Sequence, residues 1–174
     1  METFNFNYIE KVNISSFQEK VLAIKNWDKY QHRQKTYEVH RQTKTIPLIF
    51  DEDFREENLT YHEDYYKFKK NIETVKKVFD RKLGKGYIVR AILVNLLSNS
   101  KINEHMDSGY SLESCNRIHI PIITNNEVYF TVGGERKNLK DGEMWQINNN
   151  NKMHSVENTS NQDRIHLIID WKSF

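Results

Sequence analysis

The sequence contains one cysteine, two prolines and six glycines in 174 residues. A lone cysteine, Cys115, permits no intrachain disulfide and no cysteine-based zinc cluster. The longest apolar stretch, AILVNLL within residues 87–97, is far shorter than the roughly 20 residues that a membrane-spanning helix needs. The N-terminal METFNFNYIEKVNISS lacks both the basic start and the apolar core of a secretory signal. We therefore expect no membrane association, and a location in the reducing cytoplasm.

An excess of one charge is also missing. The chain has 26 Lys and Arg against 24 Asp and Glu, a net charge of +2, and both signs are spread along it. Nucleic-acid binders concentrate basic residues instead, so we expect no nucleic-acid partner. The 12% of aromatic residues is high for a disordered chain, and the length suits one folded domain better than two. We expect a single domain over residues 1–174.

The first half of the chain mixes helical and extended patterns. Apolar residues at helical spacing predict a short helix capped by Ser15 or Ser16, and a longer helix between residues 61 and 83. Between them, KTYEVHRQ and KTIPLIFD have the β-branched and aromatic composition of strands, with Pro47 at a strand edge or bulge. Residues 1–85 are therefore expected to form a mixed support region.

From residue 86 onward the period changes to short extended runs. Asn, Gly or Asp turns close these runs, which are GYIVRAILVNLL, KINEHMD, NRIHIPIIT, VYFTVGG, EMWQINNN, HSVEN and RIHLIIDW. Because no crossover helices separate them, they indicate an antiparallel sandwich, barrel or jelly roll over residues 86–174. The Asn-rich INNNNK is expected to be a hairpin turn, since Asn tolerates left-handed backbone conformations.

Ionisable side chains are unusually dense on these strands: His105, Asp107, Arg117, His119, His154, Arg164 and His166. Burying charges without partners is unfavourable, so they require one another, a metal or a bound ion. His105 and Asp107 are two residues apart and would share one face of an extended segment. With His154 they form the two-histidine, one-carboxylate set of non-haem Fe(II) oxygenases. A His-x-Asp pair alone also arises by chance, and a strand histidine is commonly structural.

Other candidates have a structural interpretation beside the functional one. Asn95 could hydrogen-bond a cosubstrate or serve as a turn or edge residue. His166 could be catalytic or make a structural hydrogen bond, and Trp145 is expected in the core rather than as a substrate platform. Three further histidines have no partner at ligand spacing and are expected on the surface: His32, His40 and His62.

Arg164 follows His154 by ten residues and opens the last apolar strand, an order that resembles the layout of 2-oxoglutarate oxygenases. In such enzymes a fixed cation pairs with the far carboxylate of the cosubstrate, for which a guanidinium is well suited. Four motifs then make the resemblance specific: RIHIP, GEMWQIN, HSVEN and RIHLIID. Together they resemble the aspartyl/asparaginyl β-hydroxylase family of Fe(II)- and 2-oxoglutarate-dependent dioxygenases, from about Val89 to the C-terminus.

The resemblance implies a double-stranded β-helix, a cupin-like jelly roll with N-terminal helices packed on one face. It implies that the His-Asp-His set holds Fe(II) and that Arg164 holds the far carboxylate of 2-oxoglutarate. Arg117 and His119 would point into the same cavity toward cosubstrate or substrate, with Asn95 near the cosubstrate. The implied reaction hydroxylates an unactivated C–H bond of an amino acid or of an Asp, Asn or Pro residue. It consumes O2 and 2-oxoglutarate, releases succinate and CO2, and would be stimulated by ascorbate.

The sequence departs from the family pattern in two places. Animal members lack the carboxylate ligand, whereas Asp107 makes this chain similar to bacterial hydroxylases of free amino acids and argues against halogenation. SNSK also replaces the Pro-Gly-rich turn that often precedes the His-x-Asp pair. A free amino acid and a residue in a peptide or protein both remain possible substrates. The alternative is a cupin-like protein that binds a metal or small ligand without turnover, which would have no need of Arg164.

Overall fold

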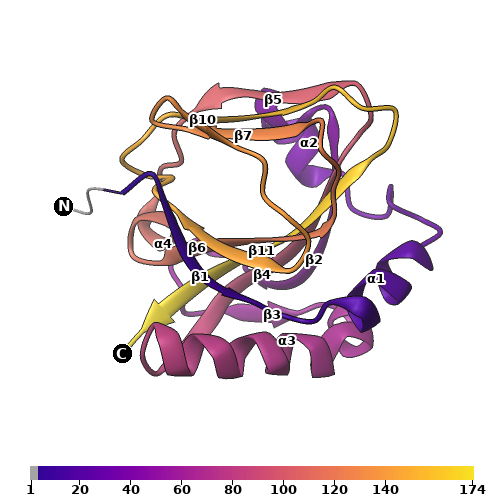
Figure 1. Ribbon diagram of the computed structural model, residues 1–174. Helices are drawn as coiled ribbons and strands as arrows, with labels where there is room; N and C mark the ends of the chain where they lie inside the picture. Colours follow the sequence, from indigo (N-terminus) through magenta and orange to yellow (C-terminus); the bar gives the residue numbers. More distant parts are fainter. Residues whose placement is uncertain (1–3) are drawn as a thin grey trace.

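Two antiparallel sheets face each other in the computed structural model, which describes residues 4–174 (Figure 1). The larger sheet has the strand order β1-β9-β6-β11-β4-β2-β3, and the smaller has the order β5-β10-β7-β8. The strands are β1 (Phe6–Lys11), β2 (Thr43–Asp51), β3 (Leu59–Tyr61), β4 (Gly86–Leu96), β5 (Ser100–His105), β6 (Asn116–Ile123), β7 (Val128–Val132), β8 (Glu135–Lys137), β9 (Glu143–Ile147), β10 (His154–Asn158) and β11 (Arg164–Ser173). The helices are α1 (Ser15–Leu22), α2 (His32–Thr36), the 3-10 helix η1 (Glu38–His40), α3 (Glu63–Lys82) and α4 (Tyr110–Glu113).

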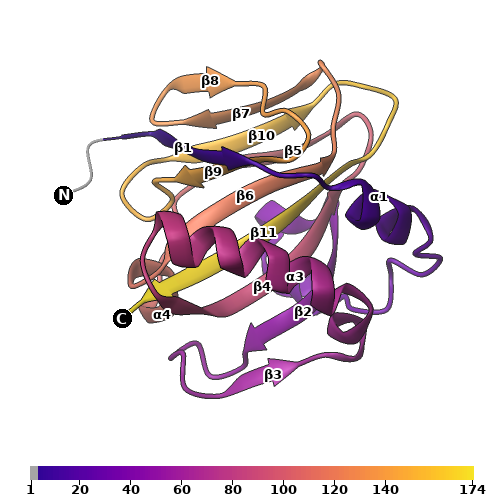
Figure 2. The ribbon, with the colours of Figure 1, turned by 60° about the horizontal axis from the view of Figure 1, so that its bottom comes forward.

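Helices α1 and α3 cover the outer face of the larger sheet (Figures 1 and 2). The ring of Phe17 on α1 stacks on Phe68 of α3 at a centroid distance of 5.5 Å. Phe79 of α3 meets Trp171 of β11 edge-on, also at 5.5 Å, and both side chains are fully buried. This helix-covered side holds the main hydrophobic core, which anchors the larger sheet from outside the barrel.

Alternate side chains of the larger sheet point into this core and into the barrel interior. On β11, Ile165, Leu167 and Ile169 belong to the helix-covered core. Arg164 and Ile168, at even positions, instead line a narrow cavity between the sheets. Successive side chains of a strand point to opposite faces, so one strand supplies the outer core and the inner cavity together.

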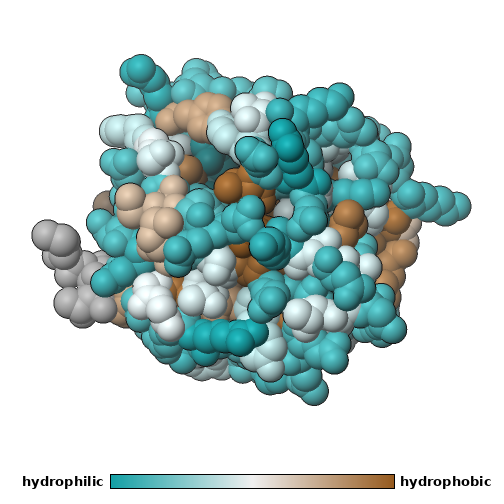
Figure 3. Space-filling view, turned by 90° about the horizontal axis from the view of Figure 1, so that it is seen from above, coloured by the Kyte–Doolittle hydropathy of each residue, from teal (hydrophilic) through white to brown (hydrophobic). Residues whose placement is uncertain are grey.

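The outer face of the smaller sheet is turned toward solvent. Seen from that side, the surface is mostly hydrophilic, with scattered hydrophobic side chains between the polar ones (Figure 3). Arg136 and Glu157 form an exposed ion pair at 3.0 Å there. No helix among residues 4–174 is long and apolar enough to cross a membrane.

Most elements expected from the sequence are confirmed. Both helices form, as α1 and α3, although the N-cap of α1 is Ile14 and neither Ser15 nor Ser16 caps it. Each of the seven extended runs after residue 86 contains a strand. KTIPLIFD lies within β2, whose pairing with β4 shifts register between Pro47 and Ile49, as expected for a bulge. The expected domain starts at residue 1, but residues 1–3 lie outside the described part of the chain.

Two local predictions are wrong. KTYEVHRQ is not extended: its first two residues end α2 and η1 follows, with Tyr37 N–H donating to the carbonyl of Arg33. Tertiary packing over the barrel mouth overrides the β propensity of Thr, Tyr and Val in this segment. INNNNK turns the chain but makes no hairpin, since β9 and β10 belong to different sheets. The turn therefore passes from one sheet to the other.

Candidate active site

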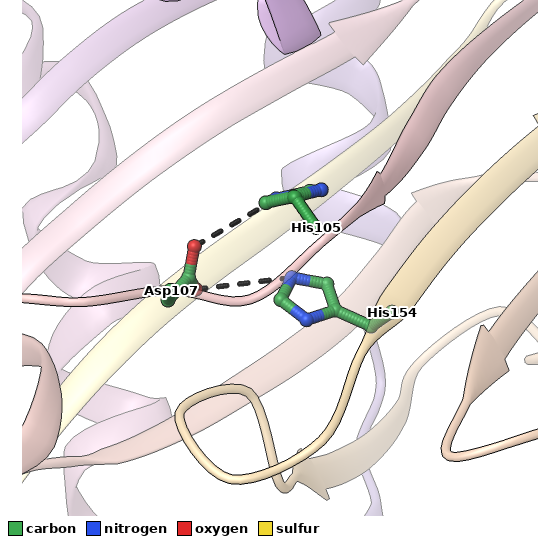
Figure 4. A group of neighbouring side chains, drawn as sticks. All are labelled: His105, Asp107 and His154. Atoms are coloured by element: carbon green, nitrogen blue, oxygen red, sulfur yellow. Dashed lines mark ion pairs between the residues drawn. The ribbon is translucent and has the colours of Figure 1, made fainter.

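Three potential metal ligands meet at the mouth of the barrel. His105 ends β5, Asp107 follows it, and His154 begins β10 directly opposite His105 in the strand pairing. Figure 4 shows the three side chains pointing toward one another. Their ligand atoms all lie within 4.8 Å of one another, with His105 Nε2 at 3.7 Å from Asp107 Oδ1 and His154 Nε2 at 3.9 Å from Asp107 Oδ2. The sequence-predicted set is therefore brought together.

The second ring nitrogen of each histidine is engaged with the backbone. His105 Nδ1 lies 2.8 Å from the carbonyl oxygen of Asn103, and His154 Nδ1 lies 3.3 Å from that of Lys152. Donation from Nδ1 to these carbonyls leaves the lone pair of each Nε2 facing Asp107. Burial lowers the pKa of His154 to about 4, so its imidazole is neutral, as a metal ligand must be. The donor set fits Fe(II).

Asp107 is held from several sides. Its backbone N–H donates to the carbonyl of Asn149 at 2.9 Å, and its Oδ2 accepts hydrogen bonds from Asn149 Nδ2 and Arg117. Burial favours the protonated form, but the nearby Arg117 cation outweighs it and holds the pKa of Asp107 well below its usual range. The carboxylate is thus charged and fixed in place before any metal binds.

Arg117 is bound by two carboxylates rather than free in the cavity. Its Nε and Nη2 donate to Asp170 at 2.8 and 2.9 Å, while Nη1 donates to Asp107. Burial alone would lower the pKa of Arg117, but these two carboxylates raise it above its usual value. The structure brings Arg117 to the site as expected, but places it as the residue that holds Asp107.

Arg164 is a buried cation without a counter-charge. Its side chain lies inside the barrel at 1% exposure, and Nη2 contacts His166 Nδ1 at 2.7 Å. Within the described residues no carboxylate forms an ion pair with it, and its Nε has no hydrogen-bond partner. Burial lowers its pKa to about 9, so the residue is still a cation at neutral pH. A buried charge is strongly disfavoured when unpaired, so this position is suited to an anion.

Two buried histidines flank this cation. His119 of β6 and His166 of β11 lie with ring centroids 5.8 Å apart, and burial followed by the charge of Arg164 lowers the pKa of both far below 6.5. Each is therefore neutral, and each has one ring nitrogen, His119 Nδ1 and His166 Nε2, without a partner among residues 4–174. His119 lines the inner cavity as expected, and His166 makes the structural hydrogen bond.

Asn95 is not brought to the site. It pairs with Ile165, a residue of the helix-covered core, so its side chain lies on the face away from the cavity. Its Nδ2 donates to Asp163 at 2.9 Å, and its neighbour Val94 lines the cavity instead. Trp145 is half-buried against the smaller core, as expected for a packing residue.

Sequence reasoning missed two residues at the mouth of the barrel. His40 was expected on the surface, but it is buried at 8% exposure, with its ring 5.8 Å from that of His105. Arg33 Nη2 contacts His40 Nε2 at 2.9 Å. His40 lies in the segment that was wrongly predicted as extended, while Arg33 precedes that segment on α2, and no spacing around either residue pointed to the site. His32 is exposed as expected, while His62 is half-buried against Tyr30.

A wider pocket leads from the surface to this cluster. Its volume is about 520 Å³, within the range of small-ligand sites. Its lining includes Tyr30, Tyr37, Phe50 and Phe54, and it adjoins the inner cavity. The residues shared by pocket and cavity are Arg33, His40, His105, Asp107 and Arg117.

The sequence matches the model of one protein family. The family model described as "Aspartyl/Asparaginyl beta-hydroxylase" matches residues 7–173. No curated protein matches the sequence significantly.

Three solved structures illustrate the fold. An oxidoreductase of the 2OG-Fe(II) oxygenase family from Burkholderia pseudomallei has a TM-score of 0.60 at 14% identity, covering 76% of this chain and 69% of its own. A Trichoplax adhaerens prolyl hydroxylase, in complex with a hypoxia inducible factor peptide fragment, has a TM-score of 0.61 at 11% identity, covering 98% and 84%. A Pseudomonas putida prolyl-4-hydroxylase has a TM-score of 0.56 at 7% identity, covering 99% and 94%. The expected jelly roll is confirmed.

Proposed function

The chain belongs to the aspartyl/asparaginyl β-hydroxylase family, and from that premise we propose that it is an Fe(II)- and 2-oxoglutarate-dependent hydroxylase of an amino acid or amino-acid residue. The observation that carries the proposal is the placement of Arg164. It lies as an unpaired buried cation in the same cavity as the His-Asp-His cluster. A dicarboxylate that reaches from the cluster to Arg164 supplies the missing counter-charge.

His105, Asp107 and His154 would hold the iron. When bound there, Fe(II) supplies the O2-dependent chemistry that hydroxylates an unactivated C–H bond while 2-oxoglutarate is converted to succinate and CO2. The protein itself would hold the metal ligands in position. Both imidazoles are fixed by their Nδ1 contacts, and Asp107 is fixed by Arg117 and Asn149, so the three side chains would hold the metal at the wall of the inner cavity.

Arg164, His119 and His166 would hold the far carboxylate of 2-oxoglutarate. The guanidinium offers a charge-assisted pair of hydrogen bonds, and its contact with His166 restricts its orientation. In the tautomers with those nitrogens protonated, His119 Nδ1 and His166 Nε2 could donate further hydrogen bonds. Water is largely excluded there, which strengthens each of these interactions.

The substrate would enter through the outer pocket, whose lining includes the candidate metal ligands His105 and Asp107. A C–H bond of the substrate would then face the open side of the cluster. The Trichoplax relative by fold was solved with a peptide, and Asp107 makes the chain resemble bacterial hydroxylases of free amino acids, so both substrate types fit the proposal. Ascorbate would act only by keeping the iron reduced.

The decisive experiment offers the protein 2-oxoglutarate, Fe(II), ascorbate and O2 and measures succinate. Amino acids and cell lysate are supplied separately, and products heavier by one oxygen atom are sought by mass spectrometry. Binding of 2-oxoglutarate to the Mn(II)-loaded protein under nitrogen gives a second readout that needs no turnover. A protein that binds metal but neither binds 2-oxoglutarate nor releases succinate would be a non-catalytic cupin-like barrel instead.

A further inference from the structure

Arg33 is a second guanidinium with unused hydrogen-bonding capacity, at the mouth of the barrel. It lies on α2, outside the β core, and its side chain lines both the inner cavity and the outer pocket. Nη2 contacts His40 Nε2 at 2.9 Å, while Nη1 is fully shielded and has no hydrogen-bond partner in the described part of the chain. Burial, together with the charge of Arg117, lowers the pKa of Arg33 to about 10, which leaves it cationic at neutral pH.

The other arginines of the outer pocket already have carboxylate partners. Arg90 is bound to Asp51 and lies over two phenylalanine rings. Arg117 is bound to Asp170 and Asp107. No ion pair is found for Arg33 among residues 4–174. Among the described residues, Arg33 is therefore the arginine of the outer pocket that has no carboxylate partner.

Loading of the site does not neutralise Arg33. The two charges of Fe(II) and that of Arg164 are balanced by Asp107 and the two carboxylates of 2-oxoglutarate. Arg117 is balanced by Asp170, and Arg90 by Asp51. Glu52 also lines the pocket, but its side chain is 56% exposed and lies 3.4 Å from His62 Nε2. Among the described residues, Arg33 therefore remains without a paired carboxylate.

We propose that Arg33 binds a carboxylate of the substrate, and that the enzyme therefore acts on a carboxylate-bearing amino acid rather than on a neutral residue within a chain. This proposal rests on the hydroxylase function proposed above. His40 orients the guanidinium by accepting a hydrogen bond from Nη2 at its Nε2, and this leaves Nη1 for the carboxylate. The aliphatic part of the substrate lies against Tyr30, Tyr37 and Phe50.

The carboxylate has two possible sources, the α-carboxylate of a free amino acid and the side-chain carboxylate of an Asp or Glu residue. The test therefore uses three probe sets: the free amino acids, their α-carboxamides, and N-acetylated Asp and Glu α-amides. Each probe is incubated with the iron-loaded protein, 2-oxoglutarate and O2, and hydroxylated product is quantified by mass spectrometry. The wild type should turn over a free acid at least about tenfold better than its carboxamide, or should prefer the acetylated Asp or Glu amide.

Arg33→Gln keeps hydrogen bonding but removes the charge. It should raise the KM for the preferred acid by about tenfold to a hundredfold, because a hydrogen bond between charged groups is lost. It should also abolish the preference for acid over carboxamide, and Arg33→Lys should fall between. Lys35→Gln, which removes an exposed charge from the same helix, should change none of these values. Calorimetry of 2-oxoglutarate binding checks that the Arg33 variants keep a folded site.

The outcomes separate the two proposals. Unchanged KM and unchanged acid preference in Arg33→Gln would overturn the role of Arg33 while leaving the hydroxylase function intact. Equal turnover of free acids and carboxamides by the wild type, together with no preference for the acetylated Asp and Glu amides, would also overturn the role of Arg33. Absence of both 2-oxoglutarate binding and succinate release from the metal-loaded wild type would instead refute the hydroxylase function itself.

Discussion

Replacement of Arg164 by methionine should have opposite effects on stability and on cosubstrate binding. The guanidinium is 1% exposed, and its polar contact is to a neutral histidine, so the ligand-free protein bears the desolvation penalty of an unpaired charge. Methionine has a similar volume and no charge. Without 2-oxoglutarate, the free energy of unfolding of Arg164→Met should therefore rise by about 1 kcal/mol or more, which is a few degrees in Tm.

The affinity of Arg164→Met for 2-oxoglutarate should fall, in contrast to its stability. Two charge-assisted hydrogen bonds to the far carboxylate would be lost, each contributing about 1.5–3 kcal/mol. Because 1.4 kcal/mol is a factor of ten, the affinity for 2-oxoglutarate should fall by about a hundredfold or more. Arg164→Lys keeps the charge but not the planar pair of donors, and should lie between wild type and Arg164→Met. Iron affinity should change little, since Arg164 is not a ligand.

The assay combines thermal unfolding without ligand with a titration of 2-oxoglutarate against succinate formation. Wild type, Arg164→Lys and Arg164→Met are measured side by side. A purely structural arginine would give the reverse pattern: a lower Tm in Arg164→Met and three superimposable titration curves. That result would refute the assignment of Arg164 to the cosubstrate.

Other substitutions and reagents test the rest of the site. His154→Ala should abolish binding of Fe(II) or Mn(II) in anaerobic calorimetry, because a neutral imidazole ligand is lost. Asp107→Gly should retain weak metal binding but lose most hydroxylation, and full activity would exclude Asp107 as a ligand. Asp170→Asn should lower the free energy of unfolding in urea by about 3–5 kcal/mol, because Arg117 loses a buried partner. Cys115, whose pKa is raised to about 12 by burial, should react with a thiol reagent at pH 8 only after unfolding.

Those parts of the site that depend on strand alternation could be read from the sequence. His105 and Asp107 are two residues apart, as are Arg117 and His119, and both pairs lie on one side of the chain as expected. The regular turns after residue 86 likewise marked each strand of the β core. Local spacing carries this information because the side-chain period of a strand is fixed at two residues.

Features set by tertiary packing could not be read in this way. β4 is buried along both faces for most of its length, so no alternation showed which face Asn95 would take, and a shift of one residue reverses the face. Arg33 and His40 lie at the site because a short helical segment folds over the barrel mouth. KTYEVHRQ, which includes His40, has the composition of a strand, and Arg33 precedes it in a stretch for which the sequence made no prediction.

The anchoring of Asp107 links the two sheets mechanically. Its backbone follows β5 of the smaller sheet, while its carboxylate is held through Arg117 to Asp170 on β11 of the larger sheet. A metal bound by both Asp107 and His154 would therefore couple the two sheets at the barrel mouth. Local separation of the two sheets would then require release of the metal. Amide hydrogen exchange in β5 and β10 should therefore slow on metal loading, in proportion to the affinity of the protein for the metal.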